Sequence, residues 1–392
     1  MSYHLWMSFS CYCFFFFGTA CTGSAQVSLV GTVRIPGTAQ DKSGLDGTLE
    51  TGTPQNALGG FSAIDYSGTE NRYFVLSDRG AGDGAASFQC RFHEIEFSAG
   101  SLTSKGRFEL LSTTILRNQD RRGLLGSLEP MKKWDGKGHA PSLDPEGIRR
   151  TTDDLFVISD EYGPSIDWFD RDGILKKSLP IPDHFRLSEK LSPPMTRGTF
   201  SNRGIEGISL SPDGRTLVAV MQGPLVQDGR IENNKCLGLA TRWIVCDLQS
   251  GKTKEWLYLL DDESTGLSEV LSIDDQRFLA LERDSKAGSK AKIKRIHLVD
   301  ASQATDISSV SSLRDGIPEG HRALSKRLLI DLMLPEYGLS GDATPEKPEG
   351  LAWGPSTIEG KRLLVVCFDN DFEPEQDSIV QAFLVDERQW KR

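Results

Sequence analysis

Short apolar runs separated by tight turns account for most of the chain. Leu155–Ile158 is one such run, and it ends abruptly in Ser159, Asp160 and Glu161. Runs of this kind, bounded by Gly, Asp or Pro, are typical of β-strands. No segment requires a long helix, and alternating strand–helix units are missing, which argues against a Rossmann or TIM-barrel fold.

One pattern of residues recurs along the chain. It begins with Glu-Gly or a similar pair, continues through an apolar strand, a turn and a second apolar strand, and ends in acidic residues. Its copies start at Gly60, Glu146, Glu206, Glu269 and Glu349, and we treat these five positions as equivalent. A repeat of four short antiparallel strands predicts a β-propeller. A β-sandwich would also show regular turns, but it has no reason to repeat one motif.

The predicted fold class is all-β, a propeller of five or six four-stranded blades. Five blades are visible, and a sixth, degenerate blade would have to lie in residues 100–142 or 300–345. Val27–Ile35 is a predicted strand outside the repeats. We expect this N-terminal strand to pair with the last blade and close the ring, which removes an exposed sheet edge.

The first 25 residues differ from the rest of the chain. The apolar run Cys13–Phe17 is followed by small residues up to Ala25, as in a signal peptide, although Lys and Arg are missing ahead of it. The run is too short for a transmembrane span. Gly18–Cys21 also resembles a degenerate lipoprotein cleavage box, with Cys21 as a lipid anchor, and an uncleaved start is a third alternative. We expect a leader at 1–25, one propeller domain at 26–392, and a secreted or periplasmic protein, or one lipid-anchored at the membrane surface.

Charge and cysteine content narrow the function classes. The 392-residue chain has a formal net charge of −10, whereas a duplex-binding protein normally presents a basic face, so no nucleic-acid partner is predicted. No Cys or His set has zinc spacing. Cys236 and Cys246 either form a disulfide or are buried core thiols.

Acidic residues gather where the predicted inner strands end. In a propeller these ends face one central channel, where close carboxylates are unfavourable unless cations, Arg or protons intervene. Oxygen ligands suit Ca²⁺. The alternative is a scaffold role, in which each Glu caps backbone N–H groups or pairs with Arg79, Arg149, Arg203 or Arg283. The candidate metal ligands are Asp78, Glu146, Asp160, Glu161, Glu206, Glu282, Glu349 and Asp369.

Three further residues are candidates for substrate binding. Arg79 and Arg283 follow acidic residues at strand ends, and Arg is suited to bidentate recognition of phosphate. Tyr162 follows the doubled carboxylate Asp160–Glu161. Residues 117–142 carry six basic side chains and are interpreted either as a solvated surface loop or as a lid over the site. Catalytic residues are not assigned, because Gly-x-Ser-x-Gly, P-loop and Gly-x-Gly-x-x-Gly motifs are missing.

Seven motifs, taken in order, resemble the phytase-like domain family, described as "esterase-like activity of phytase". The resemblance covers about residues 57–386. It implies an exported propeller-like domain and hydrolysis of a small anionic or ester substrate. The motifs are Ser77–Gly80, Asp144–Gly147, Ser159–Gly163, Asn202–Gly207, Glu282–Asp284, Pro348–Gly350 and Asp369–Phe372.

The chain departs from the family pattern at Met221–Gln222 and at Cys367–Phe368. These departures put a uniform ring of acidic ligands in doubt. From the resemblance and the acidic strand ends together, the leading hypothesis is phosphoester or ester hydrolysis assisted by Ca²⁺ at an acidic channel mouth. The alternative is a non-catalytic extracellular propeller that binds a ligand or a protein.

Overall fold

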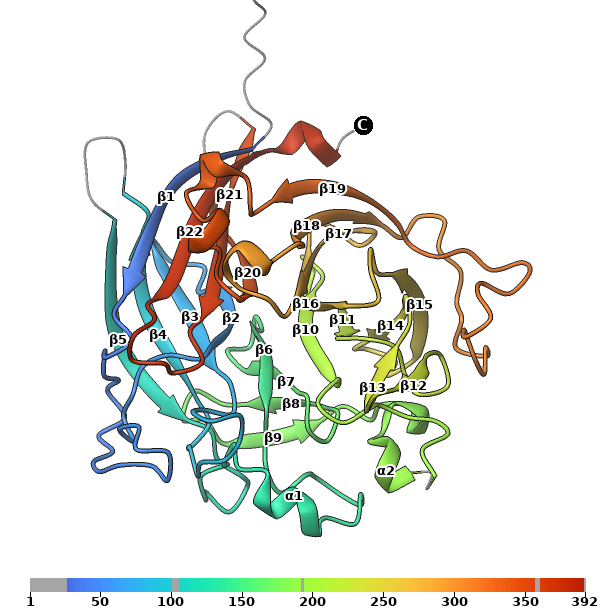
Figure 1. The fold of residues 1–392 in the computed structure, drawn as a ribbon, viewed down its shortest axis with the longest axis horizontal. Coiled ribbons are helices and arrows are strands. Elements are labelled where there is room, and N and C mark those ends of the chain that lie inside the picture. Colours follow the sequence, from blue (N-terminus) through green and yellow to red (C-terminus); the bar gives the residue numbers. More distant parts are fainter. Residues whose placement is uncertain (1–26, 101–105, 192–193, 357–359, 391–392) are drawn as a thin grey trace, which may run out of the picture.

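Five antiparallel sheets of four strands surround a central axis in the computed structural model (Figure 1). The structure describes residues 27–100, 106–191, 194–356 and 360–390. The first strand of each blade lies beside the axis, and these inner strands contact one another around the ring in the order β2, β6, β10, β16, β20 and back to β2. The predicted β-propeller is confirmed, with five blades.

The five blades follow one another along the chain. Blades 1 and 2 are β2 (Phe61–Tyr66), β3 (Arg72–Ser77), β4 (Arg91–Ser98) and β5 (Arg107–Ile115), then β6 (Pro145–Arg150), β7 (Phe156–Asp160), β8 (Ser165–Phe169) and β9 (Leu175–Ser178). Blades 3 and 4 are β10 (Ile205–Leu210), β11 (Thr216–Met221), β14 (Ala240–Asp247) and β15 (Thr253–Leu259), then β16 (Thr265–Ser272), β17 (Arg277–Asp284), β18 (Lys294–Asp300) and β19 (Ser325–Asp331). Blade 5 is β20 (Lys347–Ser356), β21 (Lys361–Asp369), β22 (Ser378–Asp386) and β1 (Val27–Ile35).

The remaining elements lie in the connections between strands. The hairpin of β12 (Arg230–Glu232) and β13 (Lys235–Leu237) turns at Asn233 and Asn234, whose φ angles of 48° and 57° suit a type I′ turn. The sequence analysis missed this hairpin. The described helices are all short: α1 (Glu129–Lys133), α2 (Ser188–Leu191), η1 (Asp183–Phe185), η2 (Gly288–Lys290), η3 (Pro335–Tyr337), η4 (Gly341–Ala343) and η5 (Glu387–Trp390).

Strand β1 closes the ring as predicted. It pairs antiparallel with β22 from Val27 opposite Val385 to Ile35 opposite Ser378. The alternative of a sixth blade is not borne out among the described residues of 100–142 and 300–345. The strand in 100–142 is β5, the outer strand of blade 1, and the strand in 300–345 is β19, the outer strand of blade 4.

The core lies between neighbouring blades, so most sheets are buried on both faces. Phe74 and Phe92 of blade 1 pack against Phe156 of blade 2, with ring centroids 4.8 and 4.5 Å apart. This burial explains why strands such as β7 are continuously apolar instead of alternating. The four described cysteines are buried and free, so Cys236 and Cys246 are core thiols and not a disulfide.

Each inner strand carries a β-bulge near the same end. The pairing register shifts between Phe61 and Ala63, and it shifts at the matching place in the other four blades. A bulge re-aims the side chain of the extra residue. The residues at this bulge position are Ser62, Glu146, Glu206, Ser268 and Glu349.

The bulges correct two of the five equivalences predicted from the sequence. Ser62 of blade 1, not Gly60, and Ser268 of blade 4, not Glu269, occupy the position of Glu146. Glu269 instead matches Gly207 of blade 3, and a Cβ built on Gly207 would lie 2.3 Å from a carboxylate oxygen of Glu269. Glycine is needed at position 207 because the Glu269 side chain fills the space beside it.

Candidate functional site

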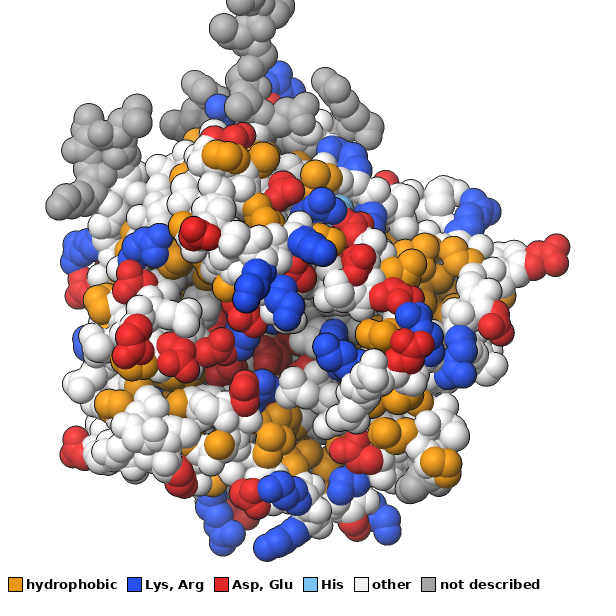
Figure 2. All heavy atoms as spheres, viewed as in Figure 1, with side chains coloured by type: hydrophobic (Ala, Val, Ile, Leu, Met, Phe, Trp, Pro, Cys, Tyr) orange, Lys and Arg blue, Asp and Glu red, His pale blue; other side chains and the backbone are white. Residues whose placement is uncertain are grey.

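A cavity of about 300 Å³ opens where the inner strands begin. Figure 2 shows it as a hollow near the middle of one face, lined by acidic side chains with basic ones at its edge. Two sets of equivalent residues contribute to its wall. The first consists of four bulge residues, Glu146, Glu206, Ser268 and Glu349. The second comes from the second strand of each blade, one position after the residue that pairs just before the bulge, and consists of Asp78, Glu161, Gln222, Arg283 and Asp369.

The strand register decides which predicted residues face the cavity. Asp160 and Glu282 still pair with the inner strand, one residue before the cavity-lining position. Because successive side chains of a strand point to opposite faces, neither residue lines the cavity. Of the eleven candidate site residues, the cavity brings together Asp78, Arg79, Glu146, Glu161, Glu206, Arg283, Glu349 and Asp369, and it does not include Asp160, Tyr162 or Glu282.

Asp160 and Tyr162 hold the end of β7 in place. The Asp160 carboxylate accepts hydrogen bonds from the backbone N–H groups of Asp144 at 2.8 Å, Tyr162 at 3.2 Å and Gly163 at 3.0 Å. The Tyr162 hydroxyl donates to the carbonyl oxygen of Gly126 at 3.1 Å. Both contacts fix the loop that positions Glu161.

Glu282 lies in a separate buried network between blades 3 and 4. Tyr258 donates to its carboxylate at 3.1 Å, and the amino group of Lys326 lies 2.9 Å from it. Asp261, Glu282 and His297 are close enough to hold a metal ion. However, Lys326 already contacts both acids, at 2.7 Å for Asp261, and Arg295 lies 2.9 Å from Asp261, so two basic residues balance the two acids.

An arginine is buried among the inner strands, outside the lining of the cavity. Arg149, whose side chain is 4% exposed, donates to four carbonyl groups that occupy the same register position in four blades. It also forms an ion pair with Glu269 at 2.8 Å, and burial raises the pKa of Glu269 to about 7 despite this pair. The four carbonyl groups belong to Ile64, Ile148, Val270 and Leu351, at distances of 3.1, 2.6, 3.0 and 3.3 Å.

Three carboxylates form the first acidic cluster, in which Glu146 and Glu161 line the cavity and Asp144 is buried behind its wall. Oxygen atoms of Asp144, Glu146 and Glu161 all lie within 4.8 Å of one another. Arg79 compensates one side of the cluster, since its guanidinium bonds to Asp144 and lies 3.5 Å from Glu161. Burial raises the pKa of Glu161 to about 8, with Asp144 as the next cause. Burial, and then the charges of the neighbouring carboxylates, raise the pKa of Glu146 well above its usual range.

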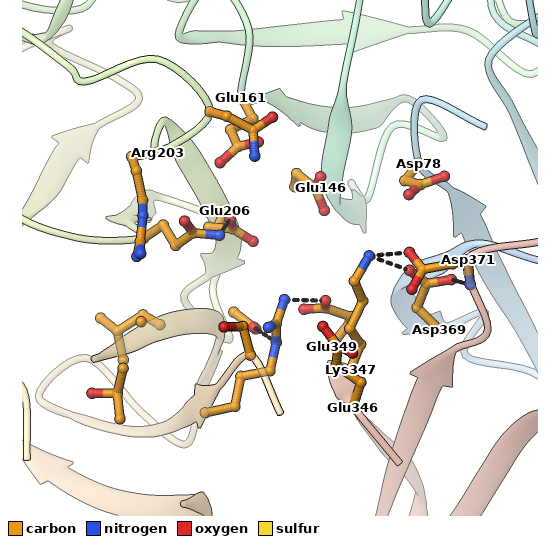
Figure 3. A pocket seen from close by; sticks show the side chains of 18 of the residues that line it. Asp78, Glu146, Glu161, Arg203, Glu206, Glu346, Lys347, Glu349, Asp369 and Asp371 are labelled. Atoms are coloured by element: carbon orange, nitrogen blue, oxygen red, sulfur yellow. Dashed lines mark hydrogen bonds and ion pairs between the residues drawn. The ribbon is translucent and has the colours of Figure 1, made fainter. Parts of the chain in front are cut away.

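A second acidic cluster already contains a cation. Asp78, Asp369 and Asp371 gather around Lys347, whose amino group lies 3.1 Å from Asp369 and also contacts Asp371 (Figure 3). Burial raises the pKa of Asp371 to about 7, with Asp369 as the next cause. The Lys347 ammonium group therefore supplies the positive charge that this acidic cluster would otherwise need from a metal ion.

The remaining wall residues form direct pairs. Arg283 donates to the Ser268 hydroxyl at 2.9 Å and bonds to Glu349, and the Gln222 amide donates to Glu206. Gln222, one of the departures from the family pattern, thus supplies a hydrogen-bond donor at the position where blade 2 has the acid Glu161.

Three residues of the cavity were not predicted as site residues. Arg203 was named from the sequence only as a possible ion-pair partner, and Lys347 was not named. They precede the motif residues Glu206 and Glu349 by three and two positions, and a basic residue shortly before the motif was the available signal. Asp371 follows Asp369 by two positions. In contrast, no basic residue of the 117–142 segment lines the cavity, which favours a surface loop over a lid.

The first acidic cluster fits a divalent cation. Oε1 of Glu161 and Oε2 of Glu349 are buried without a hydrogen-bond partner in the described part of the chain, and unsatisfied buried acceptors are costly. Hard oxygen ligands at this spacing are the donors that Ca²⁺ and Mg²⁺ prefer. The residues that would hold the ion are Asp144, Glu146 and Glu161.

Comparisons with known proteins agree with this architecture. A family model described as Phytase-like, with the description "Esterase-like activity of phytase", matches residues 56–372. An "Uncharacterized secreted protein" of Arthroderma benhamiae is 28% identical over 233 residues, which cover 50% of this chain and 45% of that protein. The chain therefore spans less than half the length of this curated relative.

Two solved structures share the arrangement only loosely. Hydrazine synthase of Kuenenia stuttgartiensis is 12% identical with a TM-score of 0.36, covering 84% of this chain and 80% of that one. A nidogen/laminin complex is 8% identical with a TM-score of 0.35, covering 90% and 91%. At these scores neither bears on function. Among the described residues, no helix is long and apolar enough to cross a membrane.

Proposed function

The chain belongs to the Phytase-like family, and from this membership we propose that its cavity hydrolyses an ester or phosphoester with the assistance of a divalent cation. The cation is held by Asp144, Glu146 and Glu161, and Ca²⁺ is the ion that these oxygen ligands suit best.

The isolation of Glu146 carries this proposal. Among the described residues, none donates a hydrogen bond to its carboxylate or forms an ion pair with it. The charges that act on it most strongly are the acids Asp144, Glu206, Glu161 and Glu349. A scaffold role predicts the opposite, namely a partner for each Glu, as Arg283 provides for Glu349. An acid surrounded by acids needs a proton or a cation.

The neighbouring residues prepare the cluster for an ion. Arg79 fixes Asp144 through its backbone N–H at 3.2 Å and through its guanidinium, so this ligand has one orientation. The turn capped by Asp160 fixes Glu161. Fixed ligands bind an ion without a large cost in side-chain entropy. A bound divalent cation supplies a Lewis acid that polarises the ester or phosphoryl oxygen and lowers the pKa of water.

The place of action in this proposal is outside the cytoplasm. The signal-peptide pattern of residues 1–25 and the printed name of the Arthroderma benhamiae relative both support export. The leader, its cleavage site and the alternative lipid anchor at Cys21 lie outside the described residues. The mature domain, residues 26–392 in this proposal, would then meet millimolar extracellular Ca²⁺, a concentration at which weak sites are filled.

Turnover and metal binding test the proposed function together. The purified protein is assayed with p-nitrophenyl acetate, p-nitrophenyl phosphate and phytate, with EDTA and with added Ca²⁺. We expect hydrolysis of at least one substrate that EDTA abolishes and Ca²⁺ restores. Ca²⁺ binding without any turnover would favour the non-catalytic binding propeller, and an unchanged melting temperature on chelation would overturn the cation site itself.

A further inference from the structure

Arg203 is the basic residue of the cavity that has no hydrogen-bond or ion-pair partner for its side chain among the described residues. It lines the wall beside Glu206, and Figure 3 shows its side chain extended there without a dashed line to any neighbour. Within the described ranges, its guanidinium forms no hydrogen bond and no ion pair within 4.0 Å. Burial lowers the pKa of Arg203, and Glu161 and Glu206 offset this effect from a distance.

The other basic residues of the cavity are occupied. Arg79 bonds to Asp144, to Asn202 at 2.8 Å and to Asp83 at 3.0 Å. Arg283 is held by Ser268 and Glu349, and Lys347 by Asp369 and Asp371. The two arginines that the sequence suggested for substrate binding, Arg79 and Arg283, are therefore already paired with carboxylates of the protein.

The fold keeps the space around Arg203 open. A Cβ built on Gly223 or on Gly266 would lie 3.4 or 3.3 Å from the same guanidinium nitrogen, Nη1 of Arg203. Both glycines flank β10, one at the end of β11 and one at the start of β16. Larger side chains at these positions would crowd the guanidinium, so its free donors stay accessible from the cavity.

Electrostatics set a condition on any anion that reaches Arg203. Nine carboxylic acids and four basic residues line the cavity, so those acids that are ionised repel an anion that enters alone. A divalent cation at the first acidic cluster removes part of that repulsion and offers the anion a second attachment point. We propose that Arg203 binds an oxyanion of the ligand, and that this binding requires a divalent cation on Asp144, Glu146 and Glu161.

The geometry favours a phosphoryl group over a carboxylate as the oxyanion. A guanidinium fork engages two oxygen atoms, so a carboxylate would have to share one of these oxygens with the cation. A phosphoryl group has three terminal oxygens and can satisfy both partners at once. This inference rests on the proposed cation site, but it concerns ligand binding and not turnover.

Calorimetry with a non-hydrolysable ligand tests the coupling. Phenylphosphonate is titrated into the full chain with EDTA and with saturating Ca²⁺, and benzoate is titrated as the carboxylate counterpart. The variants are Arg203→Gln, Arg203→Lys and the control Arg215→Gln. Arg215 lies in the exposed turn between β10 and β11, at the opposite end of the same blade.

We expect Ca²⁺ to tighten phenylphosphonate binding at least tenfold, and phenylphosphonate to tighten Ca²⁺ binding by the same factor. Arg203→Gln should remove at least tenfold of the phosphonate affinity, Arg203→Lys should retain part of it, and Arg215→Gln should change it less than twofold. Ca²⁺ affinity without phosphonate should be no weaker than in wild type for Arg203→Gln, because the substitution removes a positive charge that acts on Glu161, and retained Ca²⁺ binding also shows that the variant is folded.

Several outcomes would overturn the inference. They are equal phosphonate affinity in wild type and Arg203→Gln, equal affinity with and without Ca²⁺, or benzoate binding as tight as phosphonate binding. If Ca²⁺ binds and phosphonate does not, the proposed role of Arg203 is wrong, whereas the proposed cation site is unaffected. Failure of Ca²⁺ to bind wild type contradicts the proposed function and the inference with it.

Discussion

At the scale of single residues, the cavity contains acids that look alike in the sequence and differ in their surroundings. Glu206 receives a hydrogen bond from Gln222 and Glu349 pairs with Arg283, whereas Glu146 has neither kind of partner among the described residues. The difference cannot be read from the motif, because it depends on which side chains reach across from the neighbouring blade.

Substitution of Glu146 tests its role as a metal ligand. Glu146→Gln removes an ionisable acid whose pKa burial and its acidic neighbours raise, so we expect the metal-free protein to be as stable as wild type or more stable. The stabilisation by Ca²⁺ should disappear, whereas wild type should gain about 2.7 kcal/mol at a hundredfold excess over Kd. Thermal unfolding with EDTA and with Ca²⁺ measures both effects. The control is Glu319→Gln in an exposed loop, and equal Ca²⁺ stabilisation of all three proteins would remove Glu146 from the site.

His139 provides a pH-dependent contact outside the cavity. Its Nε2 bonds to the Asp167 carboxylate at 2.7 Å, and this hydrogen bond raises the pKa of His139 to about 9 against the opposing effect of burial. Because the folded-state pKa lies above the unfolded value of 6.5, the stabilisation is complete below pH 6.5 and is lost as the pH rises through 9.

Urea unfolding at two pH values measures this contribution. His139→Gln should lower the free energy of unfolding by roughly 1–3 kcal/mol at pH 6 and by much less at pH 9.5. His321→Gln serves as a control, because His321 is described with only a local contact to the Glu319 carbonyl. A loss for His139→Gln that is the same at both pH values would contradict the assigned ion pair.

At the scale of elements, the strands themselves were predictable and their register was not. The apolar runs and Asp-Gly turns located the strands and the N-terminal strand that completes blade 5. A bulge, however, adds one residue, and one residue decides whether a side chain faces the cavity or the blade interface. For this reason Glu269 was matched with Glu146, and Asp160 and Glu282 were placed with Glu161 and Asp369.

Strand β1 can be tested as a structural element. We compare residues 26–392 with residues 36–392, which lack β1. Removal of β1 exposes the edge of β22 and takes away the buried side chains Val33 and Ile35, which belong to the core between blades 5 and 1. The shorter chain should be less stable by several kcal/mol and prone to aggregate. Equal melting temperatures and equal solubility of the two chains would show that ring closure does not depend on β1.

At the scale of the whole molecule, the blade number was the uncertain part of the prediction. Inner strands carry the repeated motif because all five meet the same surroundings at the axis. Outer strands such as β5 and β19 face solvent and differ between blades, so they resembled the start of another blade. The structure resolves this ambiguity through pairing, since each outer strand bonds to the third strand of its own sheet.

The closed ring also creates the buried pair of Arg149 and Glu269. Arg149 collects carbonyl groups from four blades at the axis, and its partner Glu269 comes from a fourth-blade position that is glycine in blades 2, 3 and 5. Neither role follows from either residue alone, because both need the closed ring. The sequence therefore predicts the acidic end of the channel, but not the buried pair of Arg149 and Glu269.

During synthesis of the chain, β1 has to remain unpaired until β22, its partner strand, has been made. About 340 residues separate Ile35 from its partner Ser378. At ribosomal rates of ~5–20 residues per second, the first strand emerges roughly 17–70 s before its partner is made. During this interval an apolar strand edge stands open on the nascent chain. Holdase chaperones that protect such edges should therefore influence the yield of this protein more than substitutions inside any completed blade.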